Sequence, residues 1–277
     1  MSDEVIIAGA AIDDAYAHES AATRRKFVAG AAGLMGSMGM LGMASSASAA
    51  TGRAATHRRG HEGPNTAENI VAVATTAEAL ATIINTKGAQ VAGLDAVTKR
   101  NIEAAARHEL IHYQTLTSKA IGGKALTTRF WIPDAVFASP EGLLGTLVVG
   151  DQVFVNAYLL GATVFARPGG NAAARLSRIA SEFMAVEMVH RALALQSLGK
   201  LGNDRAYAKF SQVEEVEGLP TSGQPGFKNI LTAVSILQSA GIGFGEEGTV
   251  KQGAFYELSD FIAQVPNPSD VNTRNPA

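Results

Sequence analysis

Cysteine is absent from the 277-residue chain. Its absence excludes disulfide bonds, zinc sites built from thiolates, and catalysis by a cysteine nucleophile. Any metal ion must therefore be held by carboxylates and imidazoles, a ligand set that suits iron, manganese or zinc. The absence of cysteine alone does not decide the cellular compartment.

Charged residues are also scarce. They make up 17% of the chain, whereas hydrophobic residues make up 47%, and the formal net charge is only −2. A chain without a basic excess has little to attract nucleic acid or an acidic membrane surface. We therefore expect a globular protein, of one large or two small domains, that binds no nucleic acid.

Residues 1–49 have the features of a twin-arginine signal peptide. The segment Thr23–Val28 contains two adjacent arginines, a weakly hydrophobic run follows as far as Met43, and Ala47–Ala49 offers a cleavage site. The hydrophobic run is too short and too rich in glycine for a stable membrane span, although a membrane anchor is the alternative. We expect export to the periplasm or beyond through the twin-arginine machinery. Cleavage would leave equal numbers of acidic and basic residues.

Residues 50–65 form a polar segment without an apolar period, and we expect a solvated linker there. Its two histidines, His57 and His61, together with nearby arginines, could instead contact metal or phosphate. A solvated linker remains the simpler interpretation.

Two Glu-x-x-His motifs, Glu109–His112 and Glu187–His190, stand out in the rest of the chain. A shuffled chain of this composition would contain about one third of one such motif. Both lie in Ala-rich segments with helical periodicity, where residues three apart share a helix face. Each motif therefore directs a carboxylate and an imidazole the same way. Helical bundles use this arrangement to build dinuclear iron or manganese centres.

Each motif is preceded by a helix with a carboxylate on its apolar face. Glu78 lies in the apolar stripe of the first helix, and Asp151 lies among the large apolar residues of the third. A carboxylate on a buried face is costly unless it is paired or bound to metal. The pattern predicts four helices, over residues 66–86, 94–121, 140–166 and 171–199. Ser139 and Asn171 are the expected caps of the last two.

The connections complete an all-α prediction, a four-helix bundle over residues 66–199 with one long crossover. The crossover, from Gly122 to Pro140, contains the apolar stretch Phe130–Pro133, which should pack on one side of the bundle. Residues 200–277 should form a helical and irregular C-terminal extension packing on the bundle. It is expected to hold short helices over 201–217 and 227–240 and a plain loop at Gly241–Gly245.

Between about residues 65 and 199, the chain resembles the exported bacterial ferritin-like domain proteins, the group that also contains plant desiccation-related proteins. The resemblance rests on five features: Glu78, the motif at Glu109–His112, the crossover Phe130–Pro133, Asp151 followed by Ala157–Leu159, and the motif at Glu187–His190. It implies a ferritin-like four-helix bundle with a dimetal site.

The resemblance also implies a role for each ligand. Glu109 and Glu187 would bridge two ions, and His112 and His190 would each bind one. Glu78 and Asp151 would be the terminal carboxylates. One position departs from the pattern, because dimetal bundles usually carry Glu where this chain has the shorter Asp151. No catalytic residue is expected beyond these ligands.

Three functions fit these observations. The first is a dimetal oxidoreductase that oxidises iron or acts on oxygen or peroxide, and the second is a protein that stores metal without turnover. The third is a metal-free structural or stress-related protein, in which buried Glu–His contacts only fix the helix register. The sequence leaves open the metal, the substrate, and whether the chain forms a homo-oligomer.

Overall fold

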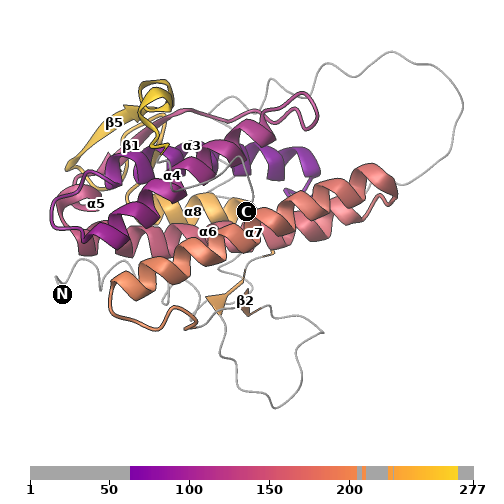
Figure 1. The fold of residues 1–277 in the computed structure, drawn as a ribbon. Helices are drawn as coiled ribbons and strands as arrows, with labels where there is room; N and C mark the ends of the chain where they lie inside the picture. The colour runs from indigo at the N-terminus through magenta and orange to yellow at the C-terminus, as the bar shows by residue number, and fades with distance from the viewer. Residues whose placement is uncertain (1–62, 205–207, 210–223, 227, 268–277) are drawn as a thin grey trace, which may run out of the picture.

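The computed structural model describes residues 63–204, 208–209, 224–226 and 228–267. The predicted signal peptide and residues 50–62 of the predicted linker lie outside this part. Most of the described chain is helical, in agreement with the predicted class (Figure 1). The structure adds a small sheet that the all-α prediction lacked.

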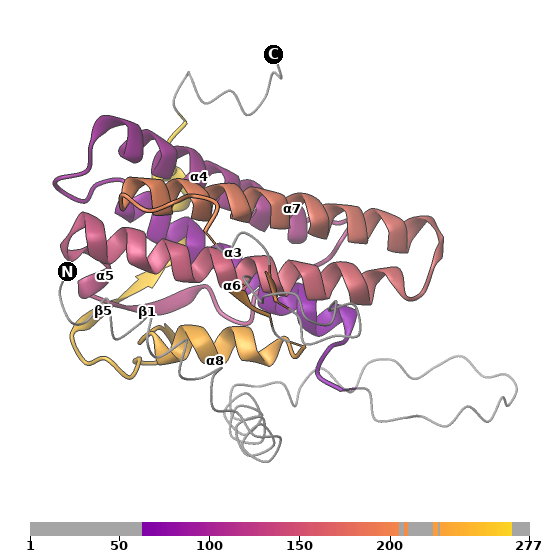
Figure 2. The ribbon, with the colours of Figure 1, turned by 90° about the horizontal axis from the view of Figure 1, so that it is seen from below.

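Four long helices lie side by side: α3 (Ala67–Gly88), α4 (Ala96–Leu116), α6 (Pro140–Ala166) and α7 (Gly170–Ser197). Helix α3 packs against α4 and α6, and α7 packs against α4 and α6, so the four close into a ring (Figures 1 and 2). Each helix directs one row of its side chains toward the interior that the four helices enclose. The ring brings together residues that are up to about a hundred positions apart.

Side-chain caps explain where three of these helices begin. Thr66 accepts a hydrogen bond from the backbone N–H of Asn69, and Asp95 accepts two, from Val97 and Thr98. Ser139 accepts one from Gly142, with Pro140 in the first helical position, as predicted.

The predicted cap at Asn171 is wrong. Helix α7 begins at Gly170, and its N-cap is Gly169, which makes no side-chain cap hydrogen bond. Gly169 and Gly170 have φ values of 72° and 79°, a backbone region that glycine enters without steric cost. This pair sets the turn, so the helix begins before Asn171. Helix α4 also ends at Leu116, earlier than the predicted Ile121.

The crossover contains a strand, β1 (Arg129–Pro133), followed by the short helix α5 (Ala135–Ala138). β1 is the centre of a three-stranded antiparallel sheet, between β4 (Gly243–Phe244) and β5 (Gly253–Glu257). The plain loop expected at Gly241–Gly245 therefore contains a short strand. Phe130 and Ile132 of β1 are fully buried, so the crossover does pack on the helices.

The C-terminal extension covers one side of the four helices. Its helix α8 (Leu231–Ser239) is shorter than the predicted 227–240 and packs along α6 (Figure 2). The 3₁₀ turns η2 (Leu258–Asp260) and η3 (Ile262–Gln264) follow β5. The helix predicted over 201–217 is wrong at residues 201–204, which form a turn, and at 208–209. There β2 (Ala208–Lys209) pairs with β3 (Gln224–Pro225). Residues 205–207 and 210–217 lie outside the described chain.

Two of the described helices, α3 and α6, are long and apolar enough to cross a membrane by length and composition. Protein surrounds 72% of the most apolar stretch of α3 and 50% of that of α6. Helix α3 is buried on almost all sides. A helix surrounded by protein needs an apolar sequence just as a membrane-spanning helix does, so both pass this test.

Candidate metal centre

In helices α4 and α7 the Glu-x-x-His motifs belong to rows of buried residues that have the same spacing. In α4 the buried row is Ile102, Ala105, Glu109, His112 and Leu116, and in α7 it is Ala180, Phe183, Glu187, His190 and Ala194. The steps alternate between three and four residues, which keeps all side chains on one face. Glu and His take equivalent positions in both rows. The two motifs therefore meet at the same level of the interior.

Helices α3 and α6 each add one carboxylate at this level. Glu78 is 0% exposed and Asp151 is 4% exposed, so both lie deep between the helices. The structure thus places all six predicted residues in one buried cluster: Glu78, Glu109, His112, Asp151, Glu187 and His190.

The first half of the cluster surrounds the Nδ1 atom of His112. This atom lies 3.4 Å from Glu78 Oε2, 3.6 Å from Glu109 Oε2 and 3.2 Å from Glu187 Oε1. Three different helices supply these three oxygens. One candidate ligand atom from each of the four residues lies within 4.8 Å of the others, a spacing that could hold a metal ion.

The second half surrounds the Nδ1 atom of His190. It lies 3.1 Å from Glu109 Oε1 and 3.4 Å from Glu187 Oε2, and Asp151 completes a group of four residues within the same 4.8 Å limit. Glu109 and Glu187 therefore belong to both halves. Each turns one oxygen toward His112 and the other toward His190.

Most polar atoms of the cluster lack a hydrogen-bond partner. Within the part of the chain that the structure describes, this holds for eight buried atoms: Glu78 Oε2, both carboxylate oxygens of Glu109 and of Glu187, Asp151 Oδ2, and Nδ1 of His112 and of His190. Seven of the eight lie at ion-pair distance from one another, 3.1–3.6 Å, but none makes a hydrogen bond with a described residue. Native proteins leave few buried polar atoms without one. All eight are atoms that can bind a cation. The donor set therefore fits a metal centre.

Burial and mutual charge shift the pKa values of the cluster. Burial raises the pKa of Glu78 and of Asp151 well above the usual carboxyl range, and neighbouring carboxylates add to the effect. Burial opposes ionisation of Glu109 too, but its contacts with both imidazoles outweigh this and hold its pKa below the usual range. Burial would lower the pKa of His112 and of His190, but the surrounding carboxylates raise both well above 6.5.

Tyr158 provides a hydrogen-bond donor for the second carboxylate oxygen of Glu78. Its hydroxyl donates to Glu78 Oε1, which leaves Glu78 Oε2 directed at His112. Burial raises the pKa of Tyr158, so the phenol stays protonated and acts as a donor. The ring of Phe183 packs edge-on to Tyr158 and stacks on His112 at 3.8 Å between centroids, which fixes both rings.

His108 supports His190 from outside the cluster. Nδ1 of His108 lies 3.1 Å from Nε2 of His190, and the two rings are nearly parallel. When His190 is neutral, a proton on its Nε2 would be donated to His108, which leaves the lone pair of Nδ1 free to bind a cation. Burial holds the pKa of His108 below 6.5, in keeping with a neutral acceptor. The sequence had placed His108 on the surface or in a supporting position, and the structure favours the second.

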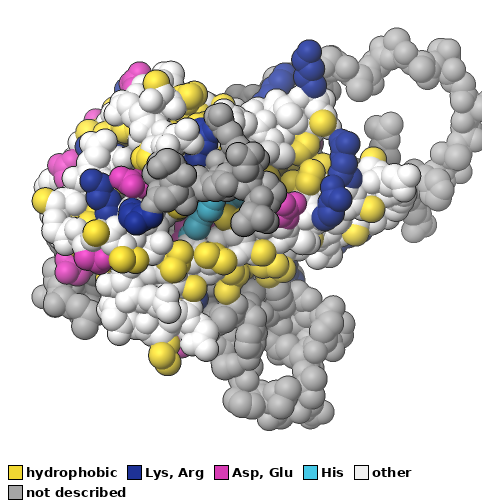
Figure 3. Space-filling view, viewed as in Figure 1, with side chains coloured by type: hydrophobic (Ala, Val, Ile, Leu, Met, Phe, Trp, Pro, Cys, Tyr) yellow, Lys and Arg dark blue, Asp and Glu magenta, His cyan; other side chains and the backbone are white. Residues whose placement is uncertain are grey.

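A small cavity adjoins the second half of the cluster. Its volume is about 20 Å³, enough for about one water molecule. Asp151 and His190 line it, together with polar side chains that include Asn85, Asn101 and Ser197. Figure 3 shows histidine atoms at the surface near the middle of the face viewed, above a band of hydrophobic side chains. The cavity beside Asp151 and His190 could hold a water-sized molecule.

Sequence reasoning gave no role to Tyr158 and Phe183. Tyr158 follows Asp151 by seven residues, and Phe183 precedes Glu187 by four, so both lie on the faces that carry the candidate ligands. Helical spacing could have identified both as neighbours of the cluster. It could not have shown that the Tyr158 hydroxyl reaches Glu78 on another helix.

Comparison of the chain with protein-family models, curated proteins and solved structures finds no match in any of the three. What the cluster can bind therefore follows from its own atoms and their geometry. The buried carboxylates and imidazoles could hold a metal ion.

Proposed function

We propose that the chain is an exported ferritin-like protein whose four-helix bundle holds a dinuclear iron or manganese centre acting on iron, oxygen or peroxide. The observation that carries the proposal is the placement of Glu109 and Glu187. Each directs one oxygen at His112 Nδ1 and the other at His190 Nδ1, as a carboxylate bridging two ions must. His112 and Glu78 would complete one ion's ligands, and His190 and Asp151 the other's.

Charge supports two divalent ions. Four carboxylates carry four negative charges when ionised, and two divalent cations would balance them in a buried site. A buried charge is tolerated only when it is compensated, so a matched total favours a dinuclear centre over a single ion. Oxygen and imidazole ligands suit iron and manganese. Such a pair, when bound, supplies one-electron oxidation and reduction at each ion.

The chain's own residues prepare this site. Tyr158 and His108 hold Glu78 and His190 from outside the cluster, so the ligand atoms are oriented before an ion arrives. The small cavity beside Asp151 has room for about one water molecule next to the proposed site. Asp151 is shorter than Glu, and the space beside it is the part of the site best able to accept such a molecule.

Export is proposed from the sequence alone. The paired arginines Arg24 and Arg25 and the run that follows them fit the twin-arginine route, which carries folded proteins. A chain exported after folding can receive its metal before it crosses the membrane. A periplasmic or secreted location follows from this proposal.

The test is turnover by the mature chain after metal removal and anaerobic reloading with ferrous or manganous ions. We expect the loaded chain to oxidise ferrous iron or consume hydrogen peroxide, and Glu109→Gln/Glu187→Gln to abolish both the activity and metal retention. The matched control, Glu103→Gln/Glu182→Gln, makes the same change outside the cluster on the same two helices and should behave as the unmodified chain.

Two outcomes would contradict the proposal. Tight metal binding without turnover would indicate storage and overturn the oxidoreductase assignment. Failure to retain either ion at any loading would overturn the metal centre and leave a metal-free structural or stress-related protein.

A further inference from the structure

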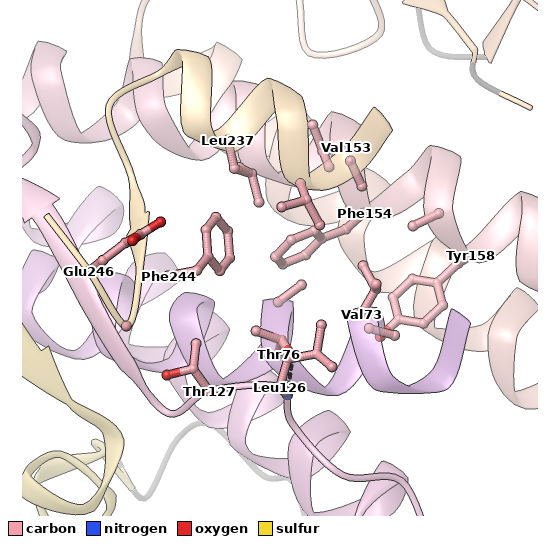
Figure 4. A pocket seen from close by; sticks show the side chains of 16 residues that line it. Val73, Thr76, Leu126, Thr127, Val153, Phe154, Tyr158, Leu237, Phe244 and Glu246 are labelled. Carbon is pink, nitrogen blue, oxygen red and sulfur yellow. Dashed lines mark hydrogen bonds between the residues drawn. The ribbon is translucent and has the colours of Figure 1, made fainter. Parts of the chain in front are cut away.

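A second, larger cavity is lined in part by Tyr158, the residue whose hydroxyl donates to Glu78. Its volume is about 330 Å³, in the range of small-molecule sites. Helices α3, α6 and α8, strand β4 and the start of the crossover enclose it (Figure 4). The C-terminal extension thus forms part of its wall. The cavity exists only because α8 and β4 cover the four helices here.

Most side chains in the cavity wall are apolar, and the few hydroxyls among them already make hydrogen bonds within the protein. Phe154, Phe244, Val153 and Leu237 extend toward the space (Figure 4). Thr76 Oγ1 already donates to Ala72 and accepts from Leu126 N–H.

The other two hydroxyls in the wall are also engaged. Thr127 Oγ1 donates to the carbonyl of Arg129 and accepts from its N–H, and the Tyr158 hydroxyl donates to Glu78. Each wall hydroxyl therefore already uses its one proton, so none is free to donate to a ligand. Burial of apolar surface must supply most of the binding of an occupant.

One charged group stands at the rim. Glu246 is exposed, and its carboxylate makes no hydrogen bond or ion pair with any residue in the described ranges. Figure 4 shows Glu246 and Tyr158 at opposite ends of the cavity. Leu126, also in the lining, is 39% exposed. The opening therefore combines an apolar edge with one negative charge.

We propose that this cavity binds a small molecule with an apolar body and a positively charged or neutral end. The body would lie between Phe154 and Phe244, with one end against the Tyr158 ring and the other at Glu246. An anionic end would face the Glu246 carboxylate, a charge of the same sign. The site requires no metal, so it stands or falls independently of the proposed metal centre.

The test is fluorescence titration of the full chain with N-phenyl-1-naphthylamine, an uncharged apolar probe, before and after manganese loading. We expect saturable binding of one probe per chain in both states. Octanol and octylamine should displace the probe, and octanoate should require about two to five times more, the size expected for one exposed charge contact. Glu246→Gln should remove this difference.

Variants locate the site. Ala233→Phe on α8 should fill the cavity and weaken probe binding at least tenfold, because Ala233 is a buried lining residue. Ser239→Phe adds the same ring to an exposed position of α8 and serves as the control.

Absence of saturable binding, or equal binding by a folded Ala233→Phe chain, would overturn the proposal. If Ala233→Phe fails to fold, Glu246→Gln decides. If the Glu246→Gln chain still requires as much more octanoate than octanol as the parent chain does, the probe lies elsewhere and the site is refuted.

Discussion

The Tyr158 hydroxyl is the hydrogen-bond donor to Glu78 Oε1, deep between α6 and α3. Because Glu78 Oε2 faces His112, the position of the whole carboxylate depends on this bond. The same phenol ring forms one end of the large cavity. Tyr158 thus separates the candidate metal ligands from the apolar space.

Tyr158→Phe tests the importance of this bond. The change keeps the ring but leaves Glu78 Oε1 without its donor, and we expect the metal-free chain to lose about 1–3 kcal/mol of unfolding free energy. Urea unfolding followed by circular dichroism measures the loss. Tyr113→Phe, the same change at a half-buried position of α4, should cost much less. Equal losses of unfolding free energy in the two variants would show that the hydrogen bond to Glu78 does not stabilise the chain.

The residues of the cluster were largely predictable, because helical spacing fixes which side chains share a face. Glu109 with His112, and Glu187 with His190, needed only the three-residue step. His108 was harder to interpret. It lies one step from Glu109 and off its face, yet the neighbouring helix α7 brings His190 within reach. Contacts between helices depend on how the helices pack, which no single periodic pattern specifies.

At the scale of elements, the long helices were predictable and the sheet was not. Helix α6 begins at the predicted cap because Ser139 and Pro140 carry the start signal in their own side chains. Strand β1 has apolar, strand-forming residues, but its partners β4 and β5 lie more than a hundred residues further on. β4 has only two residues, Gly243 and Phe244. They count as a strand only because they pair with β1. No local signal could identify it.

For the whole molecule, the four helices supply the cluster and the C-terminal extension covers them. The extension was predicted to pack on the bundle, but its contribution to a cavity wall was not. That wall requires α8, β4 and α6 to meet, which depends on tertiary packing alone. The interior so formed holds ionisable groups whose protonation must affect the stability of the entire fold.

The stability of the metal-free chain should therefore depend on pH. The pKa values of His112 and His190 are raised in the folded state, so above the ordinary value of 6.5 the folded chain holds protons that the unfolded chain has released. Folding then binds protons, and stability must fall as pH rises. The raised pKa values of Glu78 and Asp151 act in the same direction from the ordinary carboxyl range upward. The lowered pKa of Glu109 acts only on the acid side.

We expect the Tm of the metal-free chain to fall between pH 6.5 and about pH 9, as measured by differential scanning calorimetry. His112→Gln/His190→Gln should make this fall shallower, leaving the part that comes from Glu78 and Asp151. Manganese loading should reverse it, because the ligands bind metal only after losing their protons. A metal-free Tm that stays constant or rises over this range would show that the cluster does not hold these protons.

The central claim, a dinuclear centre bridged by Glu109 and Glu187, is tested most directly by anomalous X-ray scattering. Crystals of the chain would be soaked with manganous ions and measured at the manganese edge. We predict two peaks separated by about 3.5–4 Å, one beside His112 Nδ1 and the other beside His190 Nδ1. A single peak, or none at saturating manganese, would contradict the account.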